Sequence, residues 1–204
     1  TGFRTRKMVI ATGFFDGVHR GHRFLLDQLT DEARKRGEES MVITFWPHPR
    51  NVLQDDARNL RLLTSMDEKK SLLRAAGVDH VEVLPFTKSF AALTTEEYLR
   101  DYVMGRFGGK AILLGYDNRI GSDLCAPEKT AEIAGGLGLE VIREKSLASD
   151  SGVVISSTKI RNSLTEGDII AANDMLGYGY QLYGVVVSGN RLGRTIGFPT
   201  ANMQ

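Results

Sequence analysis

Short apolar runs alternate with segments of helical periodicity over the first two thirds of the chain. Apolar, often β-branched residues form five short runs, which predict buried strands at residues 8–12, 41–45, 81–84, 111–114 and 140–142. Helical spacing and cap residues predict helices between them, from residue 24 to Gly37 and at residues 64–76, 94–107 and 128–133. Strands that alternate with helices form a parallel sheet covered on both faces, so we expect an α/β fold.

The pattern changes after residue 155. Three hydroxyl residues beginning at Ser156 predict the start of one short helix, and Thr165 predicts the start of another that ends near Gly177. From Tyr180 onward, β-branched residues and repeated glycines are typical of strands and turns. We therefore expect two domains, at residues 1–178 and 179–204, and the second should have β structure.

Composition narrows the choice of partners and compartment. The 204 residues carry a formal net charge of +1, which gives no basis for a nucleic-acid partner but leaves room for a small anionic ligand. Cys125 is the one cysteine, so we expect no disulfide within the chain and a reducing, cytoplasmic location. No apolar run approaches the roughly 18 residues of a membrane span, and no signal peptide is recognisable. Because the chain does not begin with Met, we expect an incomplete or trimmed N-terminus.

A glycine-rich segment at residues 13–22 joins the first predicted strand to the first predicted helix. Glycine lets the backbone approach a ligand, and a helix start offers unpaired N–H groups and a positive dipole end to phosphate. His19 and His22 are three residues apart there, so both rings can face one point and donate hydrogen bonds to phosphate oxygens. The alternative is an ordinary turn with solvated histidines. The strand–turn–helix context favours the phosphate site.

Residues 155–161 place three hydroxyl side chains at another predicted helix start, followed by two cations. Hydroxyl and backbone N–H groups can bind a triphosphate, and the guanidinium of Arg161 can bind it through two parallel hydrogen bonds. The alternative is that Ser157 merely caps the helix, as serine often does. This segment alone does not decide between the two interpretations.

Three further segments carry candidate ligands. Residues 45–49 place His48 between two prolines, either as a ligand or as a solvated residue of a rigid turn. Residues 115–121 follow the fourth predicted strand, where loops line ligand sites, and contain Asp117. Residues 189–202 combine glycines with Thr200 and Asn202, whose oxygens suit a Mg–nucleotide site, although a glycine-rich hairpin explains the same pattern.

Together these segments resemble the bacterial FAD synthetase family, the bifunctional riboflavin kinase/FMN adenylyltransferases. Residues 13–22 are similar to the G-x-F-D-x-x-H-x-G-H signature of nucleotidyltransferases, and residues 155–161 to the I-S-S-T-x-I-R motif. Residues 45–49 resemble the F-x-P-H-P segment of the family, and residues 115–121 resemble its G-x-D-F-x-F-G loop. Residues 197–202 resemble the G-F-P-T-A-N motif of the riboflavin kinase domain. Asn118 and Ile120 depart from the family pattern, which has aromatic residues there.

The resemblance implies a Rossmann-like nucleotidyltransferase domain with a parallel five-stranded sheet, followed by the beginning of a small β-barrel that is incomplete at Gln204. It implies transfer of AMP from ATP to FMN with Mg²⁺, and riboflavin phosphorylation by the full-length protein. His19 and His22 would be catalytic. ATP would be bound by two groups of residues, namely Gly13, Phe14, Phe15, Asp16, Gly17 and Gly21, and Ser156, Ser157, Thr158 and Arg161. The remaining implied ligands are His48, Pro49 and Asp117 for the flavin, and Gly197, Pro199, Thr200 (also a metal ligand) and Asn202 for the Mg–ATP and flavin of the kinase segment.

Three other functions fit parts of the pattern. One is an adenylyl- or cytidylyltransferase with a different acceptor, the second is a flavin- or nucleotide-binding regulator without catalysis, and the third is a structural module. The kinase-like segment argues against the first, the histidine pair against the second, and the density of phosphate-type motifs against the third. A reaction with ATP, Mg²⁺ and FMN distinguishes these functions.

Overall fold

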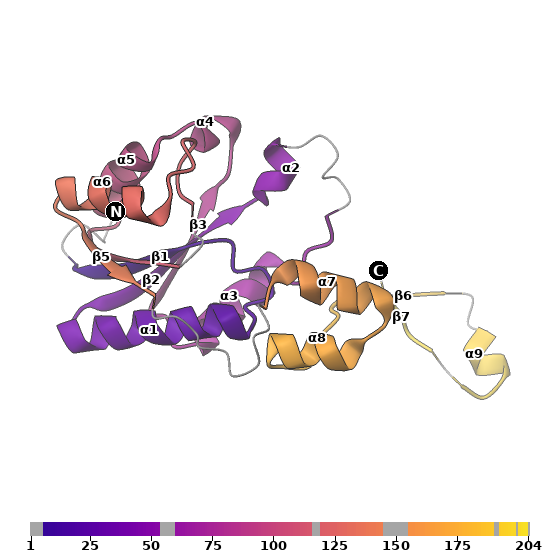
Figure 1. Cartoon of the computed structure of the whole chain (residues 1–204). Coiled ribbons are helices and arrows are strands. Elements are labelled where there is room, and N and C mark those ends of the chain that lie inside the picture. The colour runs from indigo at the N-terminus through magenta and orange to yellow at the C-terminus, as the bar shows by residue number, and fades with distance from the viewer. Residues whose placement is uncertain are drawn as a thin grey trace.

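A five-stranded parallel sheet forms the centre of the protein in the computed structural model (Figure 1). The structure describes residues 6–53, 60–115, 119–144, 155–189, 192–198 and 200–203. The strands are β1 Met8–Thr12, β2 Glu39–Trp46, β3 His80–Pro85, β4 Gly109–Leu114 and β5 Glu140–Arg143. Their order in the sheet is β3-β2-β1-β4-β5, so the chain reverses its direction of travel between β1 and β4. The predicted α/β fold and all five predicted strands are confirmed.

Helices cover both faces of the sheet, as the alternating pattern predicts (Figure 1). Helices α1 (Arg20–Arg36) and α3 (Met66–Ala75) pack on one face, where Leu26 and Leu73 meet Val9. Helix α6 (Pro127–Gly136) and the segment 95–106 pack on the other face, where Leu99 meets Ile10. Because successive strand residues point to opposite faces, Val9 and Ile10 of β1 lie in different cores.

The sequence offers two candidate caps for each of two predicted helices, Thr64 or Ser65 and Thr94 or Thr95, and the structure selects one of each pair. Ser65, rather than Thr64, caps α3 and forms a reciprocal capping box with Glu68. Thr94, rather than Thr95, caps α5 (Thr95–Glu97) in the same way. The predicted helix at 94–107 differs in its interior, because α5 continues as a π-helix, η2, at Tyr98–Arg106.

Two helices after residue 155 form a hairpin, α7 (Ser157–Glu166) and α8 (Ile169–Leu176). The prediction that Thr165 starts the second helix is wrong, because Thr165 lies inside α7. Asp168 caps α8 instead, and its carboxylate accepts a hydrogen bond from the N–H of Ala171 at 2.9 Å. Gly167 ends α7 in the left-handed region at φ 82°, which explains why the chain can turn there. Three short helices were not predicted, α2 Pro49–Leu53, α4 Lys88–Ala91 and α9 Leu192–Thr195.

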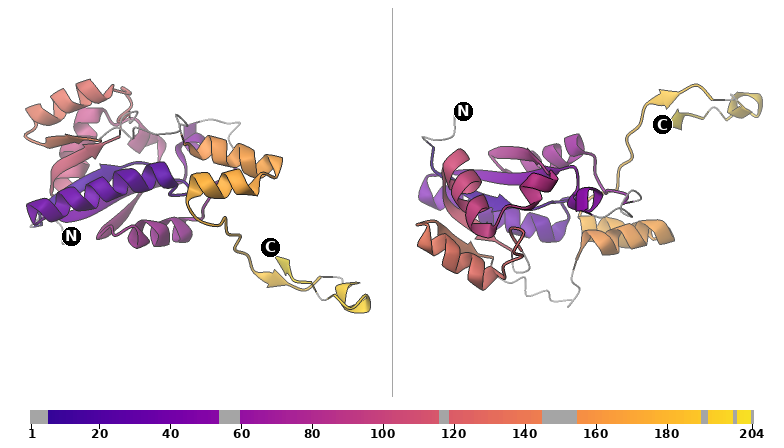
Figure 2. Two further views of the ribbon diagram at one scale, coloured as in Figure 1. Left: turned by 60° about the horizontal axis from the view of Figure 1, so that its bottom comes forward. Right: turned by 90° about the horizontal axis from the view of Figure 1, so that it is seen from above.

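The chain after residue 180 extends away from the α/β body (Figures 1 and 2). Strand structure was expected from Tyr180 onward, but the described segment has only β6 (Val186–Val187), which pairs antiparallel with β7 (Asn202–Met203). Apolar side chains such as Tyr183 and Phe198 are exposed. The expected start of a β-barrel is therefore not clearly formed, and the division at residue 178 stays a prediction. In the described part of the chain, no helix has the length and apolarity to cross a membrane.

Candidate active site

The loop between β1 and α1 lies at the carboxyl edge of the sheet, beside the place where the strand order reverses. Such a reversal opens a crevice at which ligands bind in α/β proteins. Three residues of this loop have positive φ angles, 51° at Phe15, 78° at Gly17 and 37° at Val18. A side chain on Gly17 would meet Leu63 at 2.7 Å. Positive φ at non-glycine residues is strained, and such strain clusters at functional sites.

His19 and His22 form a stacked pair at the start of α1. Their ring centroids are 3.7 Å apart with an interplanar angle of 15°. His19 caps the helix, since its Nδ1 accepts a hydrogen bond from the backbone N–H of His22 at 3.3 Å. That bond leaves the proton of a neutral His19 ring on Nε2, where it can be donated to a ligand. The ring of His22 is partly buried, and its Nδ1 has no partner in the described part of the chain.

Burial controls the charge of this pair. Desolvation lowers the pKa of His19 from 6.5 to about 4. Desolvation also lowers the pKa of His22 well below its usual value, and the charges of His19 and Lys69 lower it further. Both rings are therefore neutral at pH 7 in the free protein. Each can still donate one hydrogen bond without adding a positive charge of its own.

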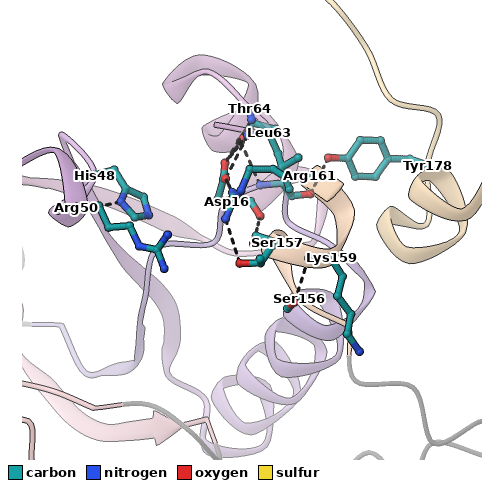
Figure 3. Close-up of polar contacts among 12 residues, drawn as sticks. Asp16, His48, Arg50, Leu63, Thr64, Ser156, Ser157, Lys159, Arg161 and Tyr178 are labelled. Carbon is teal, nitrogen blue, oxygen red and sulfur yellow. Dashed lines mark hydrogen bonds and ion pairs between the residues drawn. The ribbon is translucent and has the colours of Figure 1, made fainter. Parts of the chain in front are cut away.

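Asp16 joins three segments that are distant in the sequence (Figure 3). Its carboxylate is buried and accepts hydrogen bonds from the backbone N–H groups of Leu63 at 3.0 Å and Thr64 at 3.3 Å. It also forms an ion pair with Arg161 of α7, with 2.7 Å between Oδ2 and Nη1. The carboxylate thus holds the first-motif loop, the segment before α3 and helix α7 together.

The start of α7 lies against the same loop. Ser156 caps the helix by accepting the N–H of Lys159 at 3.3 Å, so the alternative that Ser157 is the cap is wrong. Ser157 instead donates its hydroxyl to the backbone carbonyl of Asp16 at 2.9 Å. Arg161 reaches back from the next turn to Asp16 and to Thr158 at 3.5 Å. The N-termini of α1 and α7 therefore both adjoin the first-motif loop, as Figure 3 shows for α7.

His48 connects this loop to a group of aromatic side chains. Its ring lies against Phe14, with 4.8 Å between centroids, and its Nδ1 accepts the N–H of Arg50 at 3.2 Å. Burial lowers the pKa of His48 from 6.5 to about 4, while the charge of Asp16 acts in the opposite direction. Pro49 begins α2. The aromatic group is a chain of ring contacts through Phe14, Phe45, Phe86, Phe90, Tyr98 and Tyr102.

A tyrosine from beyond α8 holds the same loop from the other side. The hydroxyl of Tyr178 donates to the carbonyl of Gly17 at 2.6 Å (Figure 3). The guanidinium of Arg23 lies over the Tyr178 ring, 5.5 Å from its centroid. Tyr180 donates its backbone N–H to the side chain of Asn173 at 2.7 Å. Both tyrosines pack on the small apolar cluster formed by Leu63 with α7 and α8.

The kinase-like segment is far from these contacts in the structure (Figure 2). Gly197 has φ 79° and is exposed, as are Thr200 and Asn202. Two implied ligands, Asp117 and Pro199, lie outside the described residues. No group of three or more His, Cys, Asp or Glu side chains suited to a metal occurs in the described part of the chain.

Comparison with known proteins shows to which family this sequence belongs. The sequence model of FAD synthetase matches residues 3–159, which include every residue of the first motif and the start of the second. This chain belongs to the FAD synthetase family. The model of riboflavin kinase matches residues 176–204, which follow the first match after an interval at residues 160–175. The resemblance inferred from the motifs is confirmed.

Relatives of the FAD synthetase family extend the similarity over the whole chain. The bifunctional riboflavin kinase/FMN adenylyltransferase of Escherichia coli (strain K12) is 38% identical over 196 residues, which cover 96% of this chain and 62% of the relative. The protein of the same name from Listeria monocytogenes is 36% identical over 200 residues, with the same coverage. This chain thus spans about 62% of the length of these curated relatives.

A solved structure supports the fold independently. The crystal structure of a macrolide-efflux protein from Streptococcus pneumoniae superposes with a TM-score of 0.84 at 32% identity. The superposition covers 97% of this chain and 64% of that protein. The arrangement of the sheet and its helices is therefore that of an experimentally determined relative.

The structure brings together most, but not all, of the residues that the sequence singled out. The histidine pair, Asp16 and the start of α7 meet at the first-motif loop, and His48 adjoins them through Phe14. Their assignment to ATP or flavin is untested and stays a prediction. Sequence reasoning missed Lys69 and Tyr178 altogether. The signal for Lys69 was available, because a lysine stands on the apolar side of α3, four residues before Leu73.

Proposed function

We propose that this chain synthesises FAD by transferring the AMP part of ATP to the phosphate of FMN, with release of pyrophosphate. The observation that carries the proposal is the position of two helix N-termini beside the first-motif loop, α1 with its stacked histidines and α7 tied to Asp16. The N-terminus of each helix favours negative charge, so two N-termini beside one loop favour the binding of a polyphosphate. The names of the relatives support the same reaction.

In the proposed reaction an oxygen of the FMN phosphate attacks the α-phosphorus of ATP. One P–O bond forms, the bond from the α-phosphorus to the bridging oxygen breaks, and pyrophosphate leaves with the bonding electrons. The residues need only position the two phosphates and stabilise charge on their oxygens. His19 supplies an N–H donor from Nε2, and the adjacent ring of His22 supplies a second. Because both rings are already stacked and capped, little reorganisation is needed during the reaction.

The two substrates are assigned to different parts of the site. We assign the triphosphate of ATP to the first-motif loop and to Ser156, Ser157, Thr158 and Arg161. We assign the flavin ring to the side of His48 and Phe14, where the aromatic side chains begin. Mg²⁺ would be held mainly by the phosphates, since the buried carboxylate of Asp16 is already paired with Arg161. The metal would neutralise phosphate charge when bound.

The kinase-like segment has a separate proposed role. Riboflavin phosphorylation is proposed for the whole protein, because this chain spans about 62% of the length of its bifunctional relatives. The hydroxyl of Thr200 and the amide oxygen of Asn202 are the oxygen donors that suit Mg²⁺ there. A cytoplasmic location and the absence of a nucleic-acid partner also remain proposals, based on the single cysteine and the net charge of +1.

The test is incubation of the purified chain with ATP, Mg²⁺ and FMN, followed by chromatography. FAD and pyrophosphate should appear in equal amounts. His22→Ala should abolish most of the product, whereas His80→Gln, a histidine substitution in β3 away from the site, should not. If the chain binds FMN and ATP but makes no FAD, it is a binding protein and the proposed reaction is wrong.

A further inference from the structure

Lys69 is a buried lysine that the site as described does not use. It lies in the second turn of α3, on the same side as the core residue Leu73, and only 2% of its surface is exposed. In the part of the chain that the structure describes, its ammonium group has no hydrogen-bond or ion-pair partner, yet Nζ is not among the closed-off side-chain atoms that lack a partner. The small exposed part of the residue therefore includes the ammonium group. Buried lysines are rare, so a position of this kind needs an explanation.

The surroundings of Lys69 are those of the proposed transfer site. The backbone N–H groups of Leu63 and Thr64, directly before α3, bond the carboxylate of Asp16, so the start of the helix that carries Lys69 is held against the first-motif loop. The positive charge of Lys69 also lowers the pKa of His22 and of His48, in keeping with that position. Burial lowers the pKa of Lys69 itself, and the charge of Asp16 partly offsets that effect. Asp16 is nevertheless occupied by Arg161 and by the two N–H groups before α3. The carboxylate of Asp16 is therefore already paired with other groups and does not neutralise the charge of Lys69.

The charge of Lys69 acts on a histidine from each side of the proposed site, which narrows the kind of ligand. His22 belongs to the loop assigned to ATP, and His48 adjoins the aromatic side assigned to the flavin. The chemical group common to both sides is a phosphate. FMN brings a phosphate with a charge of roughly −1.5 to −2 against another phosphate, and a buried cation reduces that repulsion more than a solvated one would.

We propose that Lys69 binds a substrate phosphate at the point where ATP and FMN meet. The inference rests on the proposed FAD synthesis. The ammonium group keeps its protons throughout, because the step only exchanges one P–O bond for another. Two sources could supply the phosphate oxygen, the phosphate of FMN and the α-phosphate of ATP. A purely structural lysine would contribute to neither.

Lys69→Met tests the proposal, because methionine keeps the unbranched side chain and removes the charge. The matched control is Lys70→Met, one position further along the same helix and only partly buried. Binding is measured by calorimetry for FMN against riboflavin, and for a non-hydrolysable ATP analogue with Mg²⁺ against adenosine. Lys69→Met should lower the affinity for FMN or for the ATP analogue by about 10- to 100-fold, the size expected for one charge-assisted hydrogen bond. Riboflavin and adenosine, which lack phosphate, should bind equally well to both variants.

The melting temperature of Lys69→Met distinguishes a phosphate-binding role of Lys69 from a structural role. Removing an unpaired buried charge should leave the melting temperature of Lys69→Met unchanged or raised. A binding loss that comes with a lowered melting temperature, or affinities for FMN and the ATP analogue within twofold of wild type, would overturn the proposal. If wild type makes no FAD but Lys69→Met still loses phosphate affinity, FAD synthesis is wrong and the phosphate role stands. If wild type binds neither phosphate ligand, both are wrong.

Discussion

Replacing Asp16 with alanine should destabilise this protein more than most single substitutions. The carboxylate is 3% exposed and accepts hydrogen bonds from Leu63, Thr64 and Arg161. Asp16→Ala removes all of these acceptors at once. The guanidinium of Arg161 is then left without its partner, and two backbone N–H groups lose theirs.

The size of the effect follows from this burial. Removing one partner of a buried ion pair typically costs about 3–5 kcal/mol, because the other charge stays uncompensated. The side chain of Arg161 is 19% exposed, so water can reach part of it, which favours the lower end of that range. For a chain of this size each kcal/mol lowers the melting temperature by roughly 2–4 °C. We therefore expect a decrease of roughly 6–12 °C.

Thermal unfolding followed by circular dichroism measures this change. Asp31→Ala is the control, because Asp31 and Arg34 form an ion pair at 2.8 Å in which both side chains are more than half exposed. Its loss should cost less than about 1 kcal/mol. If the two variants melt within 2 °C of each other, the buried pair contributes no more than a surface pair and the reasoning is wrong.

Two further predictions concern the histidines. His22→Ala should lower the turnover of FAD synthesis by about 10²–10³ with little change in FMN affinity, because a hydrogen-bond donor to the transition state is lost. His22→Gln should recover part of the turnover. Near-normal turnover of His22→Ala in steady-state kinetics would contradict this prediction. The depressed pKa of His19, about 4 against 6.5, means that the unfolded chain binds more protons. Stability should therefore be full above pH 6.5 and fall by up to about 3 kcal/mol as the pH approaches 4, a fall that denaturant titrations should find reduced in His19→Gln.

Much of this fold could be predicted because local signals agreed with tertiary structure. The apolar run of β1 and the glycine at residue 37 each mark an element directly. The start of α8 was misplaced because Thr165 and Asp168 are both good caps, and only the left-handed turn at Gly167 selects the second. The π-helix was also missed, because the apolar spacing of Tyr98 and Val103 does not distinguish a π-helix from an α-helix.

The sequence predicted which residues belong to the site better than it predicted the contacts between them. Residue types at motif positions indicate a phosphate site, yet they do not show which side chains bond each other. Arg161 was read as a free ligand for triphosphate, whereas it is paired with Asp16 in the structure. That pairing joins residues 145 positions apart, and the sequence between them carries no sign of it. Lys69 was missed for a related reason, since its importance comes from burial beside residues of other elements.

The hydroxyl bond from Tyr178 to Gly17 bears on where this chain can be divided. The riboflavin kinase match begins at residue 176, yet Tyr178 and Tyr180 are bonded to Gly17 and Asn173 in the α/β body. The first residues of the riboflavin kinase match therefore contact the first-motif loop and helix α8. A division of the chain before residue 180 would remove the hydrogen bond that Tyr178 gives to the first-motif loop. Cuts placed after Tyr180 leave that loop intact.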